Sequence, residues 1–542
     1  MANKTQTIVI DSILGGASQV SYFPGEGQFL GSNGIDPTEP AFFDAFVSNI
    51  FQYQASGLLC PVATEKISES SLNYAPMWFI TQPHGTTYVY DYQSSLYAVR
   101  TDGSSKFVGI SDAGELSNGQ GNGARYYDNY VYLAKSTTVA RYGPLNGTPT
   151  LDGTYWTGTL GKTALSDTTY PTNSDLFLDY PNHVLHAHSD GRLYIADVLG
   201  GEGVLHFIST TKTTVEGDTN NGSTYDAIGF GYNFHPSAME SYGDLLAVAL
   251  FQNTVSDSDS PTKAKLALWD TVSQNINLIT NDEFPDQYIS AMRNVGGILY
   301  IVSCNLSQRG FRLSRYIGGT SFEEIAYFAD GTSPFPGAVT NLGTRLLFGA
   351  GSSFPENAPS VYSYGLGQRV KSDGIFNIIR GTGDINRVTT SVCAEAPFAD
   401  AAVGVLVGWS LGITGGSNNA IDRVSRFVDY SASPSVWSSA LYNIGRPAKI
   451  TKISFNITEP IESGMIVTPT VVVDTESNSY VGGTAPGLSI INNTNYPNKT
   501  RVVMRPENLT LENNFYLRLK WTGTIRCVVA LPIIIEYEIL DD

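Results

Sequence analysis

Charged residues are scarce in this chain, and those of positive sign are scarcest. Only 15% of the 542 residues are charged, and 32 basic against 50 acidic residues give a net charge of −18. No block of Lys or Arg interrupts this acidity. Binding to the phosphates of nucleic acid needs clustered positive charge, so the composition argues against a direct nucleic-acid partner. An acidic excess is typical of a very soluble protein.

The sequence also lacks an apolar segment long enough to anchor it in a membrane. Its longest apolar stretch, Ala401–Ile413, is too short to cross a bilayer and contains Trp409 and Ser410. The N-terminus from Met1 to Gln6 shows neither the apolar core nor the cleavage site of a secretory signal. We therefore expect no membrane insertion and no export.

Cysteine is rare and forms no recognisable pair. The four residues, Cys60, Cys304, Cys393 and Cys527, lie far apart and make no CxxC motif. This usage is typical of free, buried thiols in a protein made in a reducing compartment.

Helical periodicity is nearly absent, and the composition favours short strands. The best helical candidate is Glu39–Gln54, around Phe42, Phe43, Phe46 and Ile50. By contrast the chain holds 54 Gly, 31 Tyr and 25 Phe. Aromatic and β-branched residues separated by turn-forming clusters are what an all-β protein requires.

A strand phrase recurs seven times. The copies read PMWFIT, NYVYLA, GRLYIA, GDLLAVA, GILYIV, GTRLLF and GVLVGW, and they begin at Pro76, Asn129, Gly191, Gly243, Gly297, Gly343 and Gly404. Their spacing of roughly 50 residues is the period of β-propeller blades lengthened by loop insertions. We predict about seven blades. A β-sandwich array with accidental spacing is the alternative.

Two further phrases indicate the order of strands within a blade. A strand ending in an aromatic residue follows each copy, as in Val139–Tyr142, Leu313–Tyr316 and, more loosely, Tyr88–Tyr90. Strands of small residues, Ser237–Glu240 and Ser290–Arg293, precede two copies. Small side chains suit the innermost strand, where blades crowd at the axis. Each blade is thus predicted to run from a small inner strand through an apolar second and an aromatic third to a variable outer strand.

Three regions follow from these patterns. Residues 1–74 carry no blade phrase and are predicted to form an arm or plug on the propeller. Residues 75–445 hold the repeats and end in Ser435–Tyr442, a candidate closing outer strand. Residues 446–542 alternate between apolar and polar positions, for instance at Ile453, Phe455 and Ile457. This alternation predicts a separate C-terminal β-sandwich or jelly roll that folds by itself.

The sequence assigns no catalytic, cofactor-binding or metal-binding residue. No GxSxG, GxxxxGK[ST] or HExxH motif occurs, and neither does the Ser-x-Asp-x-Gly-x-x-Trp box of sialidase-type propellers. His183, His186 and His188 lie in one segment, HVLHAH, and alternation places His186 and His188 on one strand face. Two imidazoles at this spacing can hold zinc, but no third ligand is near. We favour inner-strand histidines that line an axial channel.

Acidic residues also fail to form a recognisable site. Asp218–Asp226 mimics the start of a calcium loop without its distal Glu, and Asp257 with Asp259 indicates a surface loop. Glycosidases need two carboxylates across the scissile bond. The sequence alone cannot pair the acids that could serve, which are Asp197, Glu202, Asp226 and Glu240.

Three segments resemble propeller proteins encoded among the virion genes of tailed bacteriophages. They are the N-terminal GGASQVSYFPGEGQFLGSNGIDP, the blade phrase HSDGRLYIAD (His188–Asp197) and the ending PIIIEYEI (Pro532–Ile539). The resemblance implies a structural protein of the tail or capsid surface, assembled in the host cytoplasm. It transfers no functional residue, because that family offers no invariant catalytic signature.

The leading hypothesis is a non-enzymatic virion protein that mediates particle assembly or host attachment. Its expected partners are other virion proteins, with a host glycan or receptor and self-association left open. Loops between second and third strands would form its variable face. These are Leu199–Gly203, Phe251–Thr262, Ala350–Pro359 and Gly412–Ala420. The alternative is a carbohydrate-active enzyme, with a catalytic propeller and a sugar-binding sandwich.

Overall fold

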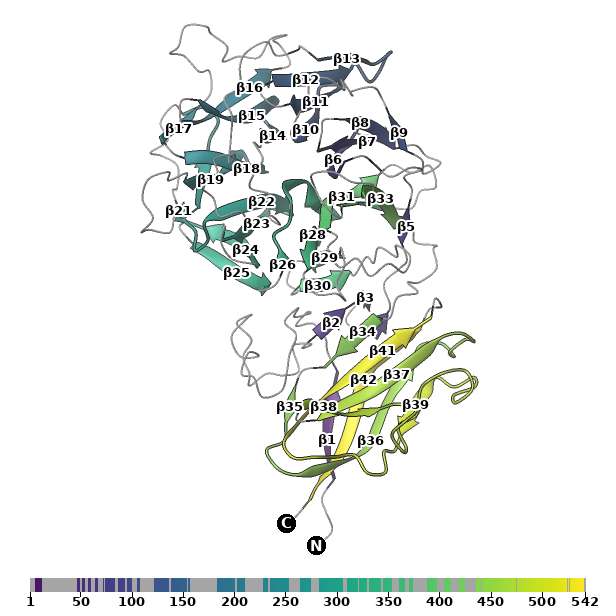
Figure 1. Cartoon of the computed structure of the whole chain (residues 1–542). Coiled ribbons are helices and arrows are strands. Elements are labelled where there is room, and N and C mark those ends of the chain that lie inside the picture. The colour runs from purple at the N-terminus through teal and green to yellow at the C-terminus, as the bar shows by residue number, and fades with distance from the viewer. Residues whose placement is uncertain are drawn as a thin grey trace.

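The computed structural model is built almost entirely of β-strands (Figure 1). It describes residues 5–11, 46–48, 51–53, 57–59, 64–66, 72, 74–82, 86–92, 95–99, 105–107, 121–135, 138–153, 155, 183–199, 202–209, 228–232, 234–252, 264–273, 282–305, 310–319, 321–328, 331–342, 345–352, 360–365, 370–373, 388–396, 404–410, 419–424, 435–439, 441–473, 475–523, 525 and 527–540, with side chains omitted at some of them. The helical content of this part is one 3₁₀ turn, η5 (Pro336–Ala338). No helix within these ranges is long and apolar enough to span a membrane.

Seven small antiparallel sheets stand around a common axis and form a seven-bladed β-propeller (Figure 1). The strands of each blade are given from the innermost outwards. Blade 1 contains β6 (Pro76–Thr81), β7 (Thr87–Asp91), β8 (Leu96–Val99) and β9 (Ser105–Phe107), and blade 2 contains β10 (Gly121–Tyr127), β11 (Tyr130–Lys135), β12 (Thr138–Gly143) and β13 (Thr150–Asp152). Blade 3 contains β14 (Leu185–Ala187), β15 (Arg192–Leu199), β16 (Glu202–Ser209) and β17 (Gly229–Tyr232), and blade 4 contains β18 (Phe234–Tyr242), β19 (Leu245–Gln252), β20 (Lys265–Trp269) and β21 (Asp282–Glu283).

The remaining three blades follow the same order. Blade 5 contains β22 (Tyr288–Val295), β23 (Ile298–Cys304), β24 (Phe311–Gly318) and β25 (Ser321–Phe328). Blade 6 contains β26 (Gly331–Thr332) and β27 (Val339–Leu342), which both pair with β28 (Arg345–Ser352), followed by β29 (Ser360–Gly365) and β30 (Val370–Asp373). Blade 7 contains β31 (Val388–Ala396), β32 (Gly404–Ser410) and β33 (Asn419–Val424). The predicted all-β propeller with about seven blades is confirmed.

The outermost strand of blade 7 comes from the N-terminal part of the chain. β5 (Thr64–Lys66) pairs antiparallel with β33, with Thr64 opposite Val424 and Lys66 opposite Asp422. The first and last segments of the propeller therefore share one sheet. This closes the ring, because blade 7 cannot leave blade 1 without breaking a β-ladder.

The C-terminal part is a sandwich of two sheets, and it includes N-terminal strands. One sheet contains β1 (Thr5–Ile10), β3 (Phe51–Tyr53), β4 (Gly57–Leu59), β36 (Ala448–Ile457), β39 (Arg501–Met504), β40 (Thr510–Leu511) and β42 (Val528–Ile539). The other contains β2 (Phe46–Ser48), β34 (Ser435–Ser438), β35 (Tyr442–Asn443), β37 (Ile466–Val473), β38 (Thr475–Val481) and β41 (Asn514–Thr522).

These pairings correct three predictions. The arm or plug expected over residues 1–74 is wrong for the described strands, because β1 to β4 belong to the sandwich and β5 to blade 7. The best helical candidate, Glu39–Gln54, is not helical where β2 and β3 are described, since both are strands. Ser435–Tyr442 does not close the propeller, because β34 pairs with β41 of the sandwich.

The propeller is therefore an insertion in the sandwich and does not simply precede it. The chain leaves the sandwich after β4, builds the propeller from β5 to β33 and returns at β34. β1 and β42 run antiparallel, with Thr5 opposite Glu538. Both chain ends consequently lie at the end of the sandwich that faces away from the propeller (Figure 1). The predicted boundary at residue 446 describes the hydrophobic pattern, but the folded unit reaches beyond it on the N-terminal side.

The repeat phrases match the strands with one shift. Six of the seven fall on second strands, β11, β15, β19, β23, β28 and β32. The first, Pro76–Thr81, is instead the innermost strand of blade 1, and Tyr88–Tyr90 belongs to its second strand. The large apolar side chains of Trp78 and Phe79 give this inner strand the apolar pattern of a second strand. The small inner strands expected at Ser237–Glu240 and Ser290–Arg293 are confirmed within β18 and β22.

Hydrophobic burial explains why both units hold together. In the sandwich, alternate residues of three strands meet in one core, for example Ile453, Leu517, Trp521 and Ile535, each at most 1% exposed. In the propeller, aromatic rings fill the wedges between blades, as where Tyr300 meets the edge of Tyr364 at 5.6 Å between centroids. Such edge-to-face pairs add to the free energy of area burial.

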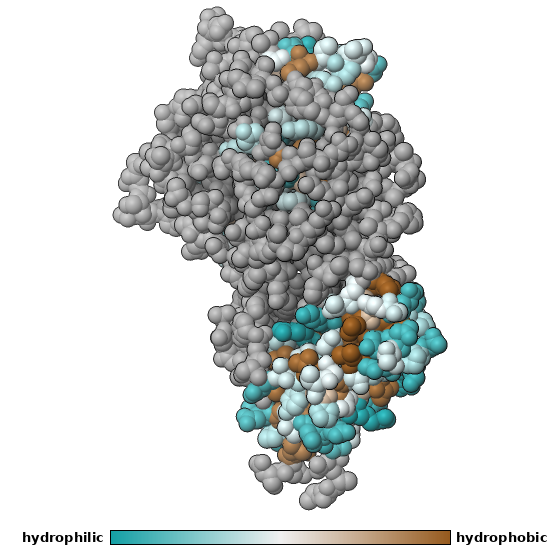
Figure 2. All heavy atoms as spheres, turned by 45° about the vertical axis from the view of Figure 1, so that its right-hand side comes forward, coloured by the Kyte–Doolittle hydropathy of each residue, from teal (hydrophilic) through white to brown (hydrophobic). Residues whose placement is uncertain are grey.

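The surface of the sandwich is mixed in character. Figure 2 shows mainly hydrophilic and neutral residues on one of its faces, with hydrophobic residues between them. Two large apolar side chains of the sandwich are exposed: the exposed fraction is 46% for Val9 and 36% for Val481. Scattered exposed apolar residues of this kind are normal for a protein surface.

The innermost strands contain β-bulges, and in blades 4 and 7 the bulge residue donates a hydroxyl hydrogen bond to the next blade. The register shifts at the same place in blades 1, 2, 4, 5 and 7. In blade 4 the bulge lies between Pro236 and Ala238, and Ser237 there donates a hydrogen bond of 2.8 Å to the Ile289 carbonyl of blade 5. A bulge re-aims one side chain without ending the strand, so here it links neighbouring blades at the axis.

Candidate ligand site in the axial channel

The innermost strands enclose a cavity of about 360 Å³ on the propeller axis. Every blade contributes to its wall, with Phe79, Arg125, His186, Glu240, Arg293, Thr340 and Val392 coming from blades 1 to 7 in turn. Cavities of ~300–1,000 Å³ are typical of small-molecule sites. The wall of this cavity contains both apolar residues and the charged residues Arg125, Glu240 and Arg293, and the charged residues determine which ligands it can bind.

One ion pair and one amide connect blades 4, 5 and 6 across the cavity. Arg293 of β22 approaches Glu240 of β18, with 3.4 Å between Nη1 and Oε2. The same guanidinium donates from Nε and Nη2 to Oδ1 of Asn341 in β27, at 3.1 and 2.9 Å. Glu240 also accepts a 3.3 Å bond from the Ser241 amide. Arg293 is therefore held by two neighbouring blades.

Arg125 of β10 is the second guanidinium of the cavity. It lies near enough to Arg293 and Glu240 for their charges to act on it. Burial lowers its pKa, repulsion from Arg293 lowers it further, and Glu240 raises it. Within the described part of the chain, Arg125 makes no hydrogen bond or ion pair.

Two imidazoles of blade 3 share one hydroxyl of blade 4 beside these charges. His186 Nε2 and His188 Nδ1 each lie 2.8 Å from Ser241 Oγ. A hydroxyl has one proton, so it can donate to only one ring and must accept from the other if both bonds form. Burial lowers the pKa of His186 well below 6.5, and the positive charge of Arg125 adds to this effect. His186 is therefore neutral at pH 7.

Glu240 is only 8% exposed, and its surroundings have opposing effects on the pKa of its carboxyl. Burial raises the pKa of its carboxyl, while Arg293 and Arg125 lower it, and the net direction is upward from 4.5. With Glu240 ionised, two guanidinium charges face one carboxylate. The cavity then carries one positive charge in excess.

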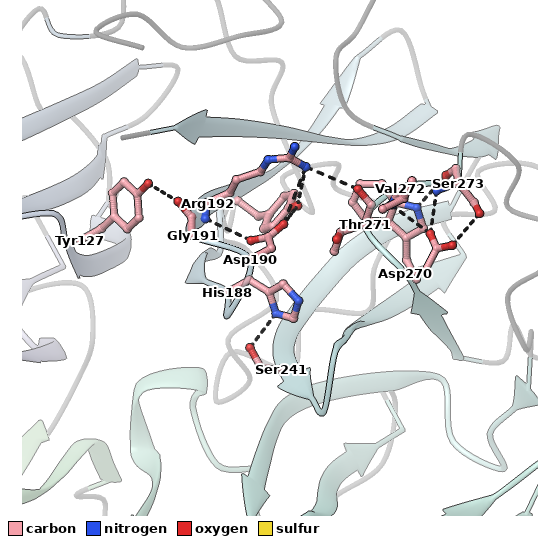
Figure 3. A network of polar contacts seen from close by, with 12 residues as sticks. Tyr127, His188, Asp190, Gly191, Arg192, Ser241, Asp270, Thr271, Val272 and Ser273 are labelled. Carbon is pink, nitrogen blue, oxygen red and sulfur yellow. Dashed lines mark hydrogen bonds and ion pairs between the residues drawn. The ribbon is translucent and has the colours of Figure 1, made fainter. Parts of the chain in front are cut away.

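A rigid polar network lies at the end of the inner strands where His188 is found (Figure 3). Asp190 accepts the Arg192 amide at 3.0 Å and the Tyr194 hydroxyl at 2.6 Å. Arg192 Nη1 reaches the Thr271 carbonyl of blade 4 at 3.4 Å, and the Tyr127 hydroxyl of blade 2 donates to the Gly191 carbonyl at 2.5 Å. Three blades are thereby joined around one turn.

The Asp270 turn completes this network on blade 4 (Figure 3). Its carboxylate accepts the Ser273 hydroxyl at 2.6 Å and the amides of Val272 and Ser273 at 3.0 and 2.7 Å. These bonds, led by that of the Ser273 hydroxyl, hold the pKa of Asp270 below its usual value. The turn therefore presents Val272, which is 81% exposed, on a fixed backbone.

The three predicted histidines divide between two places. His186 lines the axial cavity, as predicted for inner-strand histidines, and His188 contacts the same serine. His183 is separate: its Nδ1 lies 3.6 Å from Asp197, whose other oxygen lies 3.2 Å from His206 Nε2. All three of these residues are buried within blade 3. No group of three or more His, Cys, Asp or Glu suited to a metal is present in the described residues.

Within the described part of the chain, the acidic candidates do not form a pair of carboxylates. Glu202 accepts the Gly231 amide at 3.3 Å on the outer side of blade 3, whereas Glu240 lies in the cavity. Asp218–Asp226, Asp257 and Asp259 lie outside the described residues.

The predictions for thiols and loops can be compared where the chain is described. Cys304, Cys393 and Cys527 are buried and form no disulfide, as predicted, while Cys60 lies outside the described residues. Burial raises the pKa of Cys304 to about 12, so its thiol stays protonated. The four predicted loops all fall between second and third strands, although residues 253–263, 353–359 and 411–418 are not among those described.

Sequence reasoning missed Arg125 and Arg293. A signal for Arg293 was present, because the two inner-strand phrases, Ser237–Glu240 and Ser290–Arg293, end in opposite charges at the same position. Equivalent positions of neighbouring inner strands lie side by side around the axis, so opposite charges at this position indicate an ion pair between blades 4 and 5. Arg125 follows Gly123 and Ala124, and only the placement of β10 shows that it shares the cavity.

Comparisons with known proteins find distant structural likenesses and no relative by sequence. No family model and no curated protein matches the chain. The structure of YCF48 bound to a D1 peptide is similar, with a TM-score of 0.40 and 7% identity over 70% of this chain and 98% of that one. The WD40 domain of Neurospora crassa Pan2 gives 0.38 and 10% over 65% and 89%.

A longer protein is also similar. The extracellular domain of a hybrid two-component system from B. thetaiotaomicron gives a TM-score of 0.41 and 11% identity over 78% of this chain. This chain spans 45% of the length of that protein. Likenesses at such low identity and TM-score say nothing about function, because one fold can host many unrelated functions.

Proposed function

We propose that this chain is a non-enzymatic structural protein of a tailed-bacteriophage virion. In this proposal the sandwich is the base that docks on other virion proteins, and the propeller is a projecting head. The protein would be assembled in the host cytoplasm and would act in particle assembly or in host attachment.

The insertion of the propeller into the sandwich carries this proposal. Two chain crossings, from β4 to β5 and from β33 to β34, connect the units, and both flank blade 7. Strands on the N-terminal side of the propeller are hydrogen-bonded into the sandwich, for example β4 to β42. A head held by two crossings resists separation and rotation better than one on a single linker, which suits a part that transmits force between subunits.

The main alternative, a glycosidase with a sugar-binding module, finds less support in the cavity. Hydrolysis of a glycosidic bond generally uses two carboxyl groups on opposite sides of that bond. Glu240 is the one carboxylate among the described residues of the cavity wall, and it is ion-paired with Arg293. A catalytic pair would need a second acid at this place.

The choice between assembly and attachment depends on the propeller face that carries the connections from second to third strands. We favour assembly, because the sandwich offers a second contact surface such as a connector between subunits needs. Self-association and a glycan or receptor on the host remain parts of the proposal to be tested.

Mass spectrometry of purified particles is the direct test. We expect peptides of this chain in stoichiometric amounts in virions, and antibody against the propeller should decorate particles in electron micrographs. Its absence from every virion preparation would remove the proposal. Release of reducing sugar from envelope glycans by the purified chain, lost in Glu240→Gln, would instead establish the enzymatic alternative.

A further inference from the structure

One positive charge in the axial cavity has no counter-charge among the described residues that line it. Arg125 and Arg293 both line the cavity, and Glu240 provides the single opposing carboxylate. Glu240 lies 3.4 Å from Arg293, which also holds Asn341, so both ends of that pair are engaged. Arg125 is left as the charge in excess.

Keeping a guanidinium in such a place costs free energy. A charge removed from water needs an opposing charge and hydrogen-bond acceptors, or it destabilises the fold. Arg125 makes no hydrogen bond or ion pair within the described ranges, Arg293 repels it, and Glu240, which attracts it, is already paired with Arg293. A polar group that weakens the fold is typical of a binding site, where the missing partner arrives with the ligand.

We propose that the axial cavity binds a small carboxylate ligand, with Arg125 as its principal contact. The planar guanidinium offers a pair of parallel N–H donors that match the two oxygens of a carboxylate. Asn341 accepts from Arg293 through Oδ1, so its Nδ2 group is a further donor. His186, neutral at pH 7, adds polarity without adding charge.

The charge balance favours a carboxylate over a phosphate. A monoanion cancels the one excess charge of the cavity, whereas a phosphate dianion would leave a negative charge beside the buried Glu240. The cavity volume of about 360 Å³ accepts a ligand of the size of a hexuronate as well as smaller acids. A free acid and the acidic sugar of a glycan present the same chemistry here.

The test is calorimetric titration of the full chain with sodium glucuronate in a low-salt zwitterionic buffer, with glucose and inorganic phosphate in parallel. We expect saturable binding of glucuronate at a stoichiometry of one, weak binding of phosphate and none of glucose. Arg125→Gln should weaken glucuronate binding by about tenfold or more, since a charge-assisted hydrogen bond is lost. Arg315→Gln is the matched control, because Arg315 pairs with Glu323 at the blade surface.

A second measurement separates binding from a structural role. If Arg125 serves a ligand, Arg125→Gln should raise the melting temperature of the ligand-free chain, because it removes a partly buried charge that has no ion pair among the described residues. Glucuronate should then stabilise the wild type and not this variant. Equal affinity of wild type and Arg125→Gln, tighter binding of phosphate than of glucuronate, or a lower melting temperature of ligand-free Arg125→Gln would each overturn the assignment.

A further arm identifies the source of the carboxylate. Binding of a galacturonate oligomer as tightly as monomeric galacturonate would assign the cavity to an acidic glycan, and binding of monomeric galacturonate alone would assign it to a free acid. Either result keeps the carboxylate site. The site is independent of the proposed particle role, because titration of the isolated chain does not require assembly.

Discussion

The hydroxyl of Thr390 in the last blade donates a 2.6 Å hydrogen bond to the carbonyl of Pro76 in the first. Ser391 donates to the same carbonyl at 2.6 Å. Thr390 lies at the bulge of β31, as Ser237 does in β18, so the contact that joins neighbouring blades elsewhere here closes the ring. The closure thus has a side-chain part at the axis and a backbone part at β5.

Removal of the axial hydroxyls should loosen this closure. We expect Thr390→Val to lower the free energy of unfolding by about 1 kcal/mol, because Ser391 still satisfies the Pro76 carbonyl. The double variant with Ser391→Ala should lose more than the sum of the single variants, since the buried carbonyl then lacks a donor. Urea denaturation measures both. Thr484→Val, which removes an exposed turn hydroxyl of the sandwich, is the control. Strict additivity would contradict the shared role.

The backbone part of the closure can be tested at Glu65. Glu65 lies opposite Arg423 in the ladder between β5 and β33. We expect Glu65→Pro to open blade 7, because the proline ring restricts φ and disfavours the extended pairing geometry of this three-residue strand. Limited proteolysis should then cut near residues 419–424 faster than in the wild type. Glu65→Ala places no such restriction on φ and should behave as wild type. Equal cleavage of both variants would show that the ring does not depend on β5.

The sandwich should need its N-terminal strands. Residues 446–542, expected from the sequence to fold alone, lack β1 and β4, which pair along one edge of β42. This fragment should aggregate or remain unfolded by circular dichroism. A chain that joins residues 1–59 to residues 435–542 through a short Gly/Ser linker should fold cooperatively, because it restores both sheets. A folded, monomeric 446–542 fragment would show that β1 and β4 are dispensable.

Acidification should destabilise the chain through His186. Its pKa is lowered well below 6.5 in the folded state, so the unfolded state binds more protons as the pH falls through 6.5. The contribution of His186 to stability is therefore present above pH 6.5 and is lost below it. Melting temperatures between pH 7.5 and 5 should fall less steeply for His186→Gln than for the wild type.

Glu240 contributes with the opposite sign. Its folded pKa is raised above 4.5, so the folded state binds more protons and this group favours folding at the acidic end. Glu240→Gln should remove that gain and leave a steeper acid loss than in the wild type. Parallel pH profiles for all three proteins would contradict both assignments.

The variable loop of blade 4 allows a test of the working face. The stretch Phe251–Thr262 begins inside β19, and Phe251 is buried 5.4 Å from Tyr288 between ring centroids, so a shortened loop must keep it. Replacing residues 253–263 by a short Gly/Ser linker should leave the melting temperature unchanged. For an attachment role the particles should assemble and adsorb poorly to cells. For an assembly role they should fail to complete. Unchanged assembly and adsorption would exclude this loop from the working face.

Local pattern was sufficient to predict the blades. The phrases at Asn129, Gly191, Gly243, Gly297, Gly343 and Gly404 mark second strands because a buried strand must be apolar along its length and must begin and end at turn residues. Alternation likewise predicted the buried faces of β36, β41 and β42. Each of these strands has its own apolar pattern, so the sequence alone predicts where the strand lies.

Only the tertiary structure decided which distant segments pair. Nothing in Thr64–Lys66 or Thr5–Ile10 marks them as partners of β33 and β42, because the edge of a sheet accepts many short strands and backbone hydrogen bonds carry no sequence code. The same holds for the cavity. Arg125, Glu240 and Arg293 come from separate blades, and their charges acquire meaning only when the closed ring brings them around one axis.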